Sequence, residues 1–207
     1  MDMISGKRSP IQGWHESQDA DTGQAACSQL MLRDMSGVPM LEVKGPGAAD
    51  WLQVRDLPVP ARIYAGDVIG ENGWITRTGR EEYLLRGAVG SQLSDLAEDV
   101  ADGVYRHGVL ISSRQDALFL LTGQRIGELM AQSCGLDYAA ITPRQTVLSR
   151  VAAVSCGLLK DQMEDNPVCW LWLDPSHGLY LWEQLVQIIQ ELDGVVVRGC
   201  SWLEVSG

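Results

Sequence analysis

The stretch Leu41-Glu-Val-Lys-Gly-Pro-Gly-Ala-Ala-Asp-Trp-Leu52 has the pattern of a strand, a tight turn and a helix. A comparable stretch follows as Leu118-Phe-Leu-Leu-Thr-Gly-Gln-Arg-Ile-Gly-Glu-Leu-Met130. Each apolar run ends at a glycine, a small residue follows four positions later, and apolar residues then recur at helical spacing. The glycine and small residue are Gly45 with Ala49, and Gly123 with Gly127. Glycine permits turn angles that a side chain forbids, and the small residue should let the helix pack closely. The sequence therefore predicts duplicated strand-glycine-helix units.

Each predicted turn places the N-terminus of a helix beside the end of a strand. Free N–H groups and the helix dipole favour an anion at such a place. Neither stretch, however, contains the complete G-x-G-x-x-G pattern or the Lys-Ser/Thr pair of a phosphate loop. Close packing at the glycine turn is the preferred interpretation, and phosphate or dinucleotide binding is the alternative.

Composition limits the classes of protein to which the chain can belong. Its 207 residues, 45% of them hydrophobic, suit one large domain or two small lobes with a substantial core. A formal net charge of −11, with no local cluster of Lys or Arg, disfavours nucleic acid and anionic membranes as partners. The five cysteines are widely spaced and form no C-x-x-C pair, so we expect reduced and mostly buried thiols. No signal peptide or membrane-spanning run is apparent, and we expect a cytoplasmic location.

We expect three parts along the chain: a polar N-terminal arm over residues 1–28, a first α+β lobe over 29–113 and a second α+β lobe over 114–207. Hairpins alternate with single helices about twice, which makes the fold class α+β with antiparallel β hairpins. Turn signals at Asn72-Gly73 and Thr78-Gly79 predict a meander. Strand character is expected from near Leu30 through 38–44, then over 67–86 as the meander, 106–113, 146–159, 166–174 and from Val195. The helices expected besides that of the second glycine unit are 46–53, 92–101 and one that starts at 174–176 and runs to about Leu192, ended by Gly194.

Tryptophan is unusually frequent, with seven residues against one Phe. In the run Cys169-Trp-Leu-Trp-Leu173, strand alternation places Trp170 and Trp172 on one face and the other residues on the opposite face. Both faces must then be covered. The preferred interpretation is a central strand with helices on one side and a sheet or loop on the other; the alternative is a subunit interface. Trp14 is the expected anchor of the arm, so the candidate interface residues are Trp14, Trp170 and Trp172.

No residue pattern indicates catalysis. His15, His107 and His177 are far apart and belong to no metal or nucleophile motif. The acidic residues are expected on solvated faces. We therefore predict no catalytic, cofactor-binding or metal-binding residue in this chain.

Four segments, taken together and in this order, resemble a known family. They are Val43-Lys-Gly-Pro-Gly-Ala-Ala-Asp-Trp-Leu52, Leu121-Thr-Gly-Gln-Arg-Ile-Gly-Glu-Leu129, Ser149-Arg-Val-Ala-Ala-Val154 and Trp172-Leu-Asp-Pro-Ser-His-Gly-Leu-Tyr-Leu-Trp-Glu-Gln-Leu185. They resemble the gamma subunit of heterotetrameric sarcosine oxidase over about residues 30–200. That family is similar in fold to the folate-binding region of the glycine-cleavage aminomethyltransferase and to a folate-binding protein of iron–sulfur enzyme maturation. The Lys-Gly-Cys-Tyr-x-Gly-Gln type motif of the maturation protein is absent.

The resemblance implies a non-catalytic structural subunit that binds no cofactor and docks onto a large alpha-type flavoprotein subunit. Its partner subunits are expected to carry FAD, FMN, NAD and tetrahydrofolate, and the complex to demethylate sarcosine or a related N-methyl or secondary amine by oxidation. The alternative is a stand-alone tetrahydrofolate-dependent aminomethyltransferase-like protein or a folate-binding assembly protein. This alternative requires an acidic clamp for folate, and no motif in the chain supplies one.

Overall fold

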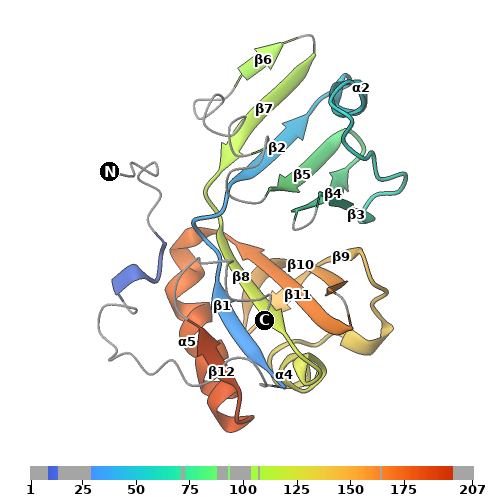
Figure 1. Ribbon diagram of the computed structural model, residues 1–207. Helices are drawn as coiled ribbons and strands as arrows, with labels where there is room; N and C mark the ends of the chain where they lie inside the picture. The colour runs from blue at the N-terminus through green and yellow to red at the C-terminus, as the bar shows by residue number, and fades with distance from the viewer. Residues whose placement is uncertain are drawn as a thin grey trace. The chain divides into compact units, whose positions relative to one another are not determined.

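A computed structural model describes residues 9–13, 29–70, 73–87, 93, 104–106, 108–163 and 165–197. These residues form two six-stranded sheets and a small number of helices, so the predicted α+β class is confirmed (Figure 1). The chain divides into two compact units. Unit 1 comprises residues 1–37, 116–143 and 147–207, and unit 2 comprises residues 38–115 and 144–146.

Unit 2 is a sheet covered on one face by a short helix. The strand order is β3-β4-β5-β2-β7-β6, and every described pairing in it is antiparallel. Apolar side chains on one face, including Leu41, Ile75 and Leu85, pack with Ala48 and Leu52 of the helix to form the core. The elements are β2 (Met40–Lys44), α2 (Ala48–Gln53), β3 (Gly66–Ile69), β4 (Gly73–Gly79), β5 (Glu82–Arg86), β6 (Val104–Arg106) and β7 (Val109–Arg114).

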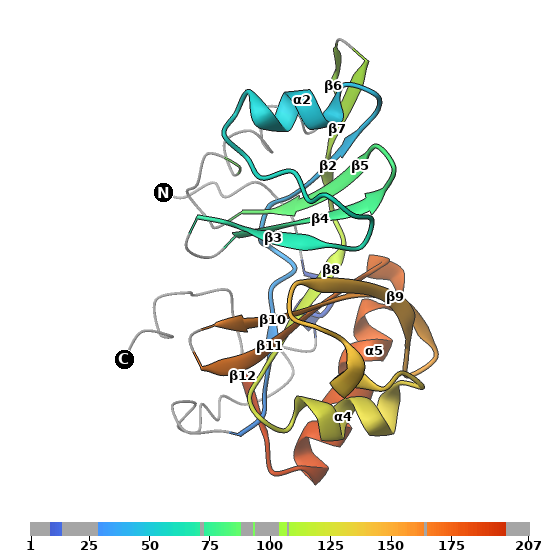
Figure 2. The same ribbon diagram turned by 90° about the vertical axis from the view of Figure 1, so that its right-hand side faces the viewer.

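Unit 1 contains the larger core. Its sheet has the order β12-β1-β8-β11-β10-β9, and Figure 2 shows α4 and α5 on the same side of it. Phe119 and Trp182 pack in a tilted arrangement inside this core, with ring centroids 5.2 Å apart and an interplanar angle of 59°. The elements are β1 (Met31–Asp34), β8 (Ala117–Thr122), α4 (Ile126–Ser133), η2 (Tyr138–Ala140), β9 (Gln145–Val151), β10 (Val154–Met163), β11 (Asn166–Leu173), η3 (Pro175–His177), α5 (Gly178–Glu191) and β12 (Val195–Val197).

The two glycine turns predicted from the sequence have the same backbone angle. Gly45 and Gly123 both have φ of 115°, a backbone angle that residues with a side chain rarely adopt. Each also lacks space for a side chain, because a Cβ at either glycine would lie 2.2 Å from a carbonyl oxygen, of Gly108 and Gln29 respectively. Glycine is therefore required at both turns for conformational and for steric reasons.

The predicted role of Gly127 is wrong. This residue is exposed on α4, and a Cβ built on it would meet nothing within 4 Å. Close packing of α4 on the sheet comes instead from Ile126, Leu129 and Met130, which are buried. A small residue at helical spacing after a turn is thus not sufficient evidence for close approach.

Each unit contains a strand, a helix and three antiparallel strands, the last of which pairs with the first strand. In unit 2 this series is β2, α2, β3, β4 and β5, and in unit 1 it is β8, α4, β9, β10 and β11. The first strand of each series, β2 or β8, has a second neighbour in its sheet that lies outside the series. β1 precedes β2 but pairs with β8, whereas β7 precedes β8 but pairs with β2. The units are consequently interleaved in sequence and differ from the successive lobes 29–113 and 114–207 that we expected.

The C-terminus of α5 has a different cap from the one expected. Asp193, with φ of 51°, adopts the left-handed conformation that we had expected at Gly194. The N–H of Gly194 donates to the carbonyl of Ile189 at 2.8 Å, and that of Asp193 donates to the carbonyl of Gln190 at 3.2 Å. This is a Schellman motif. Gly194 is needed for another reason, because a Cβ there would lie 2.8 Å from the carbonyl oxygen of Leu30.

Two hairpin predictions also need correction. The segment 146–159 is two strands, β9 and β10, joined at Ala152 and Ala153, which have φ of 45° and 69°. Two positive φ angles define the tight hairpin turn that usually takes Asn-Gly, so its sequence signal was absent here. Thr78-Gly79 is no turn, because both residues belong to β4, where the register shifts between Arg77 and Gly79. Glycine inside a strand often marks such a bulge.

Several predictions fall outside the described residues. These are the arm apart from residues 9–13, with Trp14 and His15; the helix 92–101 apart from the buried Leu93; His107; Cys27; and Cys200. Among the described residues, no helix is long and apolar enough to span a membrane.

Candidate functional site

The structure places Trp170 and Trp172 on the predicted face of β11, opposite the unit 1 core. Cys169, Leu171 and Leu173 belong to that core, as strand alternation requires. Both indole side chains are nevertheless buried within the chain itself, with exposed fractions of 2% and 7%.

Their cross-strand neighbours explain part of this burial. Trp170 lies opposite Leu120 of β8, and Trp172 lies opposite Leu118. On the other side, Gly157 of β10 pairs with Trp172, and a Cβ at this glycine would be 2.0 Å from Cε2 of the indole. The absence of a side chain at Gly157 thus makes room for the ring.

In the chain alone, Trp170 and Trp172 are therefore buried on a covered strand, as the preferred interpretation of the sequence predicts. Their role in a subunit interface remains a prediction, as does that of Trp14, which lies outside the described residues. Of the three, the structure describes Trp170 and Trp172, which share one face of β11. A pocket and an exposed connection in unit 2 form the candidate site instead.

Unit 2 has a small open pocket beside the first glycine turn. Its volume is about 200 Å³. The turn between β4 and β5 forms one wall and the start of α2 forms another. Its lining residues are Gly45, Pro46, Ala49, Arg77, Arg80, Glu81 and Tyr83.

Arg77 organises this pocket and the connection that leads to it. Its Nη1 donates to the carbonyl of Ala61 at 3.0 Å and, at 3.4 Å, to that of Pro60. Its Nε donates to the carbonyl of Gly79 at 3.2 Å, and its Nη2 donates to that of Arg80. The guanidinium carbon lies 5.5 Å from the centroid of the Tyr83 ring. One side chain therefore fixes the extended connection after α2 to the turn between β4 and β5.

The same connection ends in two exposed apolar residues, Ile63 and Tyr64, whose exposed fractions are 48% and 40%. Tyr64 has φ of 66°, which is rare for a bulky side chain. Its N–H donates to the carbonyl of Arg77 at 2.7 Å, and its carbonyl accepts from the N–H of Thr146 at 2.8 Å. Arg144, with φ of 60°, lies beside it and pairs with Asp67 at 3.5 Å. Strained residues held by surrounding bonds are enriched at functional sites, which makes Ile63 and Tyr64 a candidate contact surface.

The chemistry of this site is that of binding. All three nitrogens of Arg77 already donate to backbone carbonyls, so the remaining polar groups of the pocket belong to Arg80, Glu81 and Tyr83. Ligand pockets for drug-sized molecules occupy roughly 300–1,000 Å³, and a folate is of that size. The pocket does not fit a whole folate. In the part of the chain that the structure describes, no group of three or more His, Cys, Asp and Glu residues is arranged to hold a metal ion.

A buried cation lies elsewhere in unit 2. Arg86 of β5 is fully buried, and desolvation lowers its pKa to about 9, so it stays protonated at neutral pH. It pairs across the sheet with Met40 and Trp74. Burial of this kind is uncommon for arginine.

The described cysteines of unit 1 are free, and burial makes two of them poor nucleophiles. Desolvation raises the pKa of Cys156 to about 11 and that of Cys169 to about 12. The neighbouring Tyr138 hydroxyl also has a raised pKa, mainly through burial and then through Cys169. Lys160 donates to the carbonyl of Tyr138 at 3.0 Å and lies 4.7 Å from its ring centroid. The expectation of reduced, buried thiols is confirmed for Cys156 and Cys169, whereas Cys134 is only half-buried.

His177 is exposed on η3.

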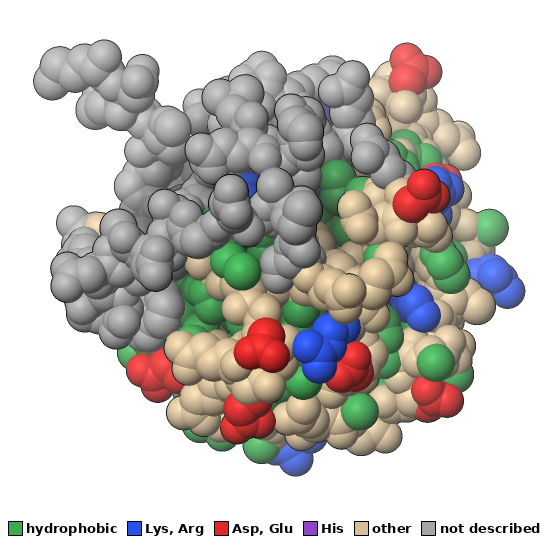
Figure 3. Space-filling view, turned by 60° about the horizontal axis from the view of Figure 1, so that its bottom comes forward, with side chains coloured by type: hydrophobic (Ala, Val, Ile, Leu, Met, Phe, Trp, Pro, Cys, Tyr) green, Lys and Arg blue, Asp and Glu red, His purple; other side chains and the backbone are tan. Residues whose placement is uncertain are grey.

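Sequence reasoning missed the Arg77 site entirely. No motif marks an arginine that donates to carbonyls, and no composition signal marks a tyrosine with positive φ. The prolines of Leu57-Pro-Val-Pro60 did indicate the extended connection that Arg77 holds. Where Figure 3 colours the described residues, acidic and basic side chains are scattered among other residues and form no broad basic area.

Comparison with known proteins supports the fold. No family model and no curated protein sequence matches the chain. Among solved structures, it is similar to glycine cleavage system aminomethyltransferase T from Bartonella henselae, with a TM-score of 0.69 and 16% identity, over 91% of this chain and 58% of that chain. It is also similar to a chain of heterotetrameric sarcosine oxidase from Corynebacterium sp. U-96 in complex with pyrrole 2-carboxylate, with a TM-score of 0.69 and 14% identity, over 92% of this chain and 98% of that chain. The chain thus spans little more than half the length of the aminomethyltransferase and has an aminomethyltransferase-type fold.

Proposed function

We propose that this chain is a non-catalytic structural subunit, of the gamma type, in a heterotetrameric sarcosine oxidase-type flavoenzyme complex. The observation that supports the proposal is the share of each solved chain that this chain covers. At equal TM-scores, the chain covers 98% of the sarcosine oxidase chain but only 58% of the aminomethyltransferase chain. Coverage of nearly the whole of one sarcosine oxidase chain supports the subunit proposal.

The described site is consistent with this role. Arg77 presents Ile63 and Tyr64 on a connection that is fixed by hydrogen bonds to its side chain and backbone. A surface that is ordered before binding loses less conformational entropy when a partner docks. Tyrosine is also enriched among the residues that dominate interface energies. In this proposal, Ile63 and Tyr64 contact a large alpha-type flavoprotein subunit.

The remaining expectations concern the complex and belong to the proposal. FAD, FMN, NAD and tetrahydrofolate are held by the partner subunits, and the complex oxidatively demethylates sarcosine or a related N-methyl or secondary amine. Duplication of an ancestral folate-binding unit would account for the shared series of elements in units 1 and 2. A cytoplasmic location fits these cofactors.

The alternative is a stand-alone tetrahydrofolate-dependent aminomethyltransferase-like protein or a folate-binding assembly protein, favoured by the fold match with aminomethyltransferase T. Calorimetric titration of the isolated chain with tetrahydrofolate separates the two proposals. Our proposal predicts no saturable heat from the chain alone, and turnover of an N-methyl amine by the purified complex that contains it. Stoichiometric binding of tetrahydrofolate by the chain alone, with no flavoprotein partner in the cell, would favour the alternative.

A further inference from the structure

A short described piece of the N-terminal segment, Ser9 to Gly13, is bound to unit 1. Ile11 is fully buried in the unit 1 core, although most of the surrounding sequence is polar. Its burial removes a large aliphatic side chain from water, which stabilises the bound segment. The anchor of this segment within the described residues is therefore Ile11.

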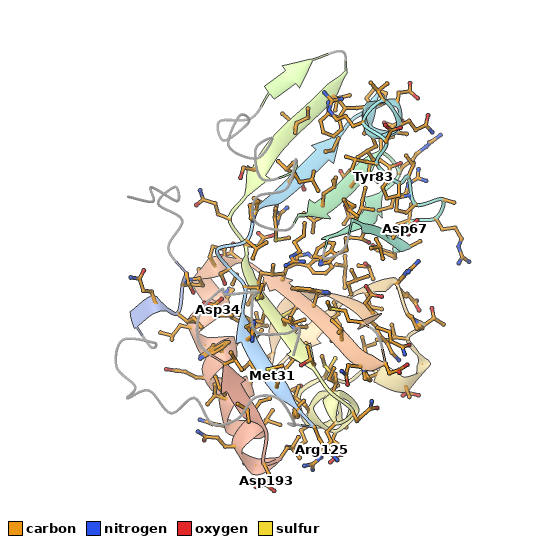
Figure 4. The ribbon with its side chains drawn as sticks, in the orientation of Figure 1. Met31, Asp34, Asp67, Tyr83, Arg125 and Asp193 are labelled. Carbon is orange, nitrogen blue, oxygen red and sulfur yellow. The ribbon has the colours of Figure 1, made fainter. Side chains whose placement is uncertain are left out.

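Ser9 fastens the segment on its polar side. Its hydroxyl donates to Oδ2 of Asp34, a carboxylate at the end of β1 that is only 2% exposed (Figure 4). The same hydroxyl oxygen accepts from the N–H of Ile11 at 3.2 Å, and the Ser9 carbonyl accepts from the N–H of Gln12 at 3.2 Å. The segment is thus a compact turn closed by its own serine.

Pro10 lies between these two contacts and packs on the first residue of α5. A Cβ at Gly178 would be 2.7 Å from Cγ of Pro10 and 3.1 Å from Cβ of Ala117. The glycine consequently leaves space for the proline ring. The site therefore offers a different complement to each of three successive residues: a carboxylate for a hydroxyl, a glycine for a proline and a core position for a branched aliphatic side chain.

Asp34 also connects this site to the segments that run from one unit to the other. Its Oδ1 accepts from the N–H of Ser36 at 3.0 Å and from the Ser36 hydroxyl at 2.6 Å. The Ser36 hydroxyl in turn accepts from the N–H of Leu118 at 3.1 Å, and the carbonyl of Leu118 accepts from the N–H of Met35 at 2.7 Å. The chain crosses from unit 1 to unit 2 after Gly37 and returns at Asp116. The carboxylate that holds Ser9 thus also ties the departing segment to the returning one.

We propose that Ser9–Gly13 is an intramolecular peptide ligand, and that unit 1 contains a binding site for peptides with the pattern hydroxyl residue, proline, branched aliphatic residue. Fifteen residues separate Gly13 from Gln29, which accepts from the N–H of Arg125 at 3.1 Å. A ligand on the same chain as its site binds intramolecularly, and short flexible linkers give effective concentrations on the order of millimolar. Weak intrinsic binding is then sufficient to keep the site filled, and the site is open to the same peptide supplied separately once the chain's own ligand is weakened.

The test uses the full chain with Ile11→Ser, which weakens the internal ligand, and a synthetic peptide of residues 7–13 with blocked ends. We expect the variant to unfold at a lower urea concentration than the wild-type chain, and the peptide to restore the midpoint with half-saturation at or below the order of millimolar. Peptides with Ser9→Ala or Ile11→Ser should restore less than a tenth as much at equal concentration. Val54→Ser, which makes the same kind of change at an 81% exposed position, is the matched control and should leave the midpoint unchanged.

A second variant guards against a chain that fails to fold. Ser9→Ala keeps Ile11 and removes only the bond to Asp34, so its midpoint should fall less, and the wild-type peptide should still bind it measurably. An unchanged midpoint in Ile11→Ser would overturn the proposal. So would a lowered midpoint that no peptide restores, or one that the Ile11→Ser peptide restores as well as the wild-type peptide does.

Discussion

Gly157 of β10 and Trp172 of β11 are cross-strand partners, and the indole ring occupies the space that a side chain at residue 157 would need. A Cβ at Gly157 would lie 2.0 Å from Cε2 and 2.2 Å from Cζ2 of Trp172. The indole ring has little room to shift away from an added side chain, because Trp172 is 93% buried. This pair links the tryptophan-rich strand, prominent in the sequence, to a glycine that has no sequence signal.

Gly157→Ala should lower the free energy of unfolding by about 3 kcal/mol, because the added methyl group would overlap a buried indole ring on the face of the sheet opposite the unit 1 core. Urea denaturation followed by tryptophan fluorescence measures the change. Gly127→Ala is the matched control on exposed α4 surface, and it should raise stability by about 0.5–1 kcal/mol through helix propensity. Equal losses for the two variants would contradict the assigned fit.

Ala153→Gly should stabilise the chain by about 1 kcal/mol. Ala153 is exposed at the turn between β9 and β10 with φ of 69°, where glycine has no conformational penalty. The control is Ala131→Gly at an exposed position inside α4, where the same substitution should destabilise by about 0.5–1 kcal/mol. The two thermal melts must move in opposite directions, and a shift to lower temperature in both would refute the turn assignment.

The sequence predicted those features that local chemistry determines. The glycine turns at Gly45 and Gly123 and the face of β11 on which Trp170 lies follow from backbone angles and strand alternation. The exchange of β1 and β7 between the units was not predictable, because pairing of strands distant in sequence depends on burial of whole faces. The Ala152-Ala153 turn escaped notice because it lacks the usual Asn-Gly pair.

The site was less predictable than the fold. Arg77 acts through its distances to carbonyls of a separate loop, and nothing in its local sequence differs from that of a solvated arginine. Ile11 was hidden for a related reason. A single aliphatic residue in a polar stretch carries no periodicity, so the sequence does not mark Ile11 as a core residue.

Arg77→Met should lower the free energy of unfolding by about 2 kcal/mol, since it leaves carbonyls of the connection after α2 without their charged donor. Amide hydrogen exchange around residues 57–64 should become faster at the same time. Arg80→Met changes an exposed side chain of the same pocket and should alter stability by no more than about 0.5 kcal/mol. Similar exchange rates in the two variants would show that Arg77 does not hold the connection.

Cys169 should give the chain a measurable sensitivity to alkaline pH. Its pKa is raised to about 12 in the folded state, mainly by burial, against about 8.5 for an unperturbed thiol. Between these values the unfolded state loses the proton first, so the stabilising contribution is complete below about pH 8.5 and declines as pH rises towards about 12. The stability difference between wild type and Cys169→Ala should therefore shrink from about pH 7.5 to about pH 10.5. Val168→Ala, a buried change without a titrating group, should show a constant difference, and a constant difference for Cys169→Ala as well would exclude the effect.

Ile63→Asp combined with Tyr64→Ala should prevent recovery of the chain with its flavoprotein partner. Both side chains are exposed, so urea denaturation should find the isolated variant nearly as stable as wild type. Leu148→Asp, at an aliphatic side chain that is 56% exposed on β9, serves as the control and should be recovered with the partner as wild type is. Loss of the partner in the control but not in the double variant would move the contact surface away from Ile63 and Tyr64.

The most direct measurement is gentle purification of the chain from the cells that make it, followed by size-exclusion chromatography with absorbance recorded across the flavin bands. The account predicts that the chain elutes with larger yellow subunits, and that an N-methyl amine such as sarcosine bleaches their colour when oxygen is excluded. Elution as a colourless monomer that binds tetrahydrofolate would contradict it.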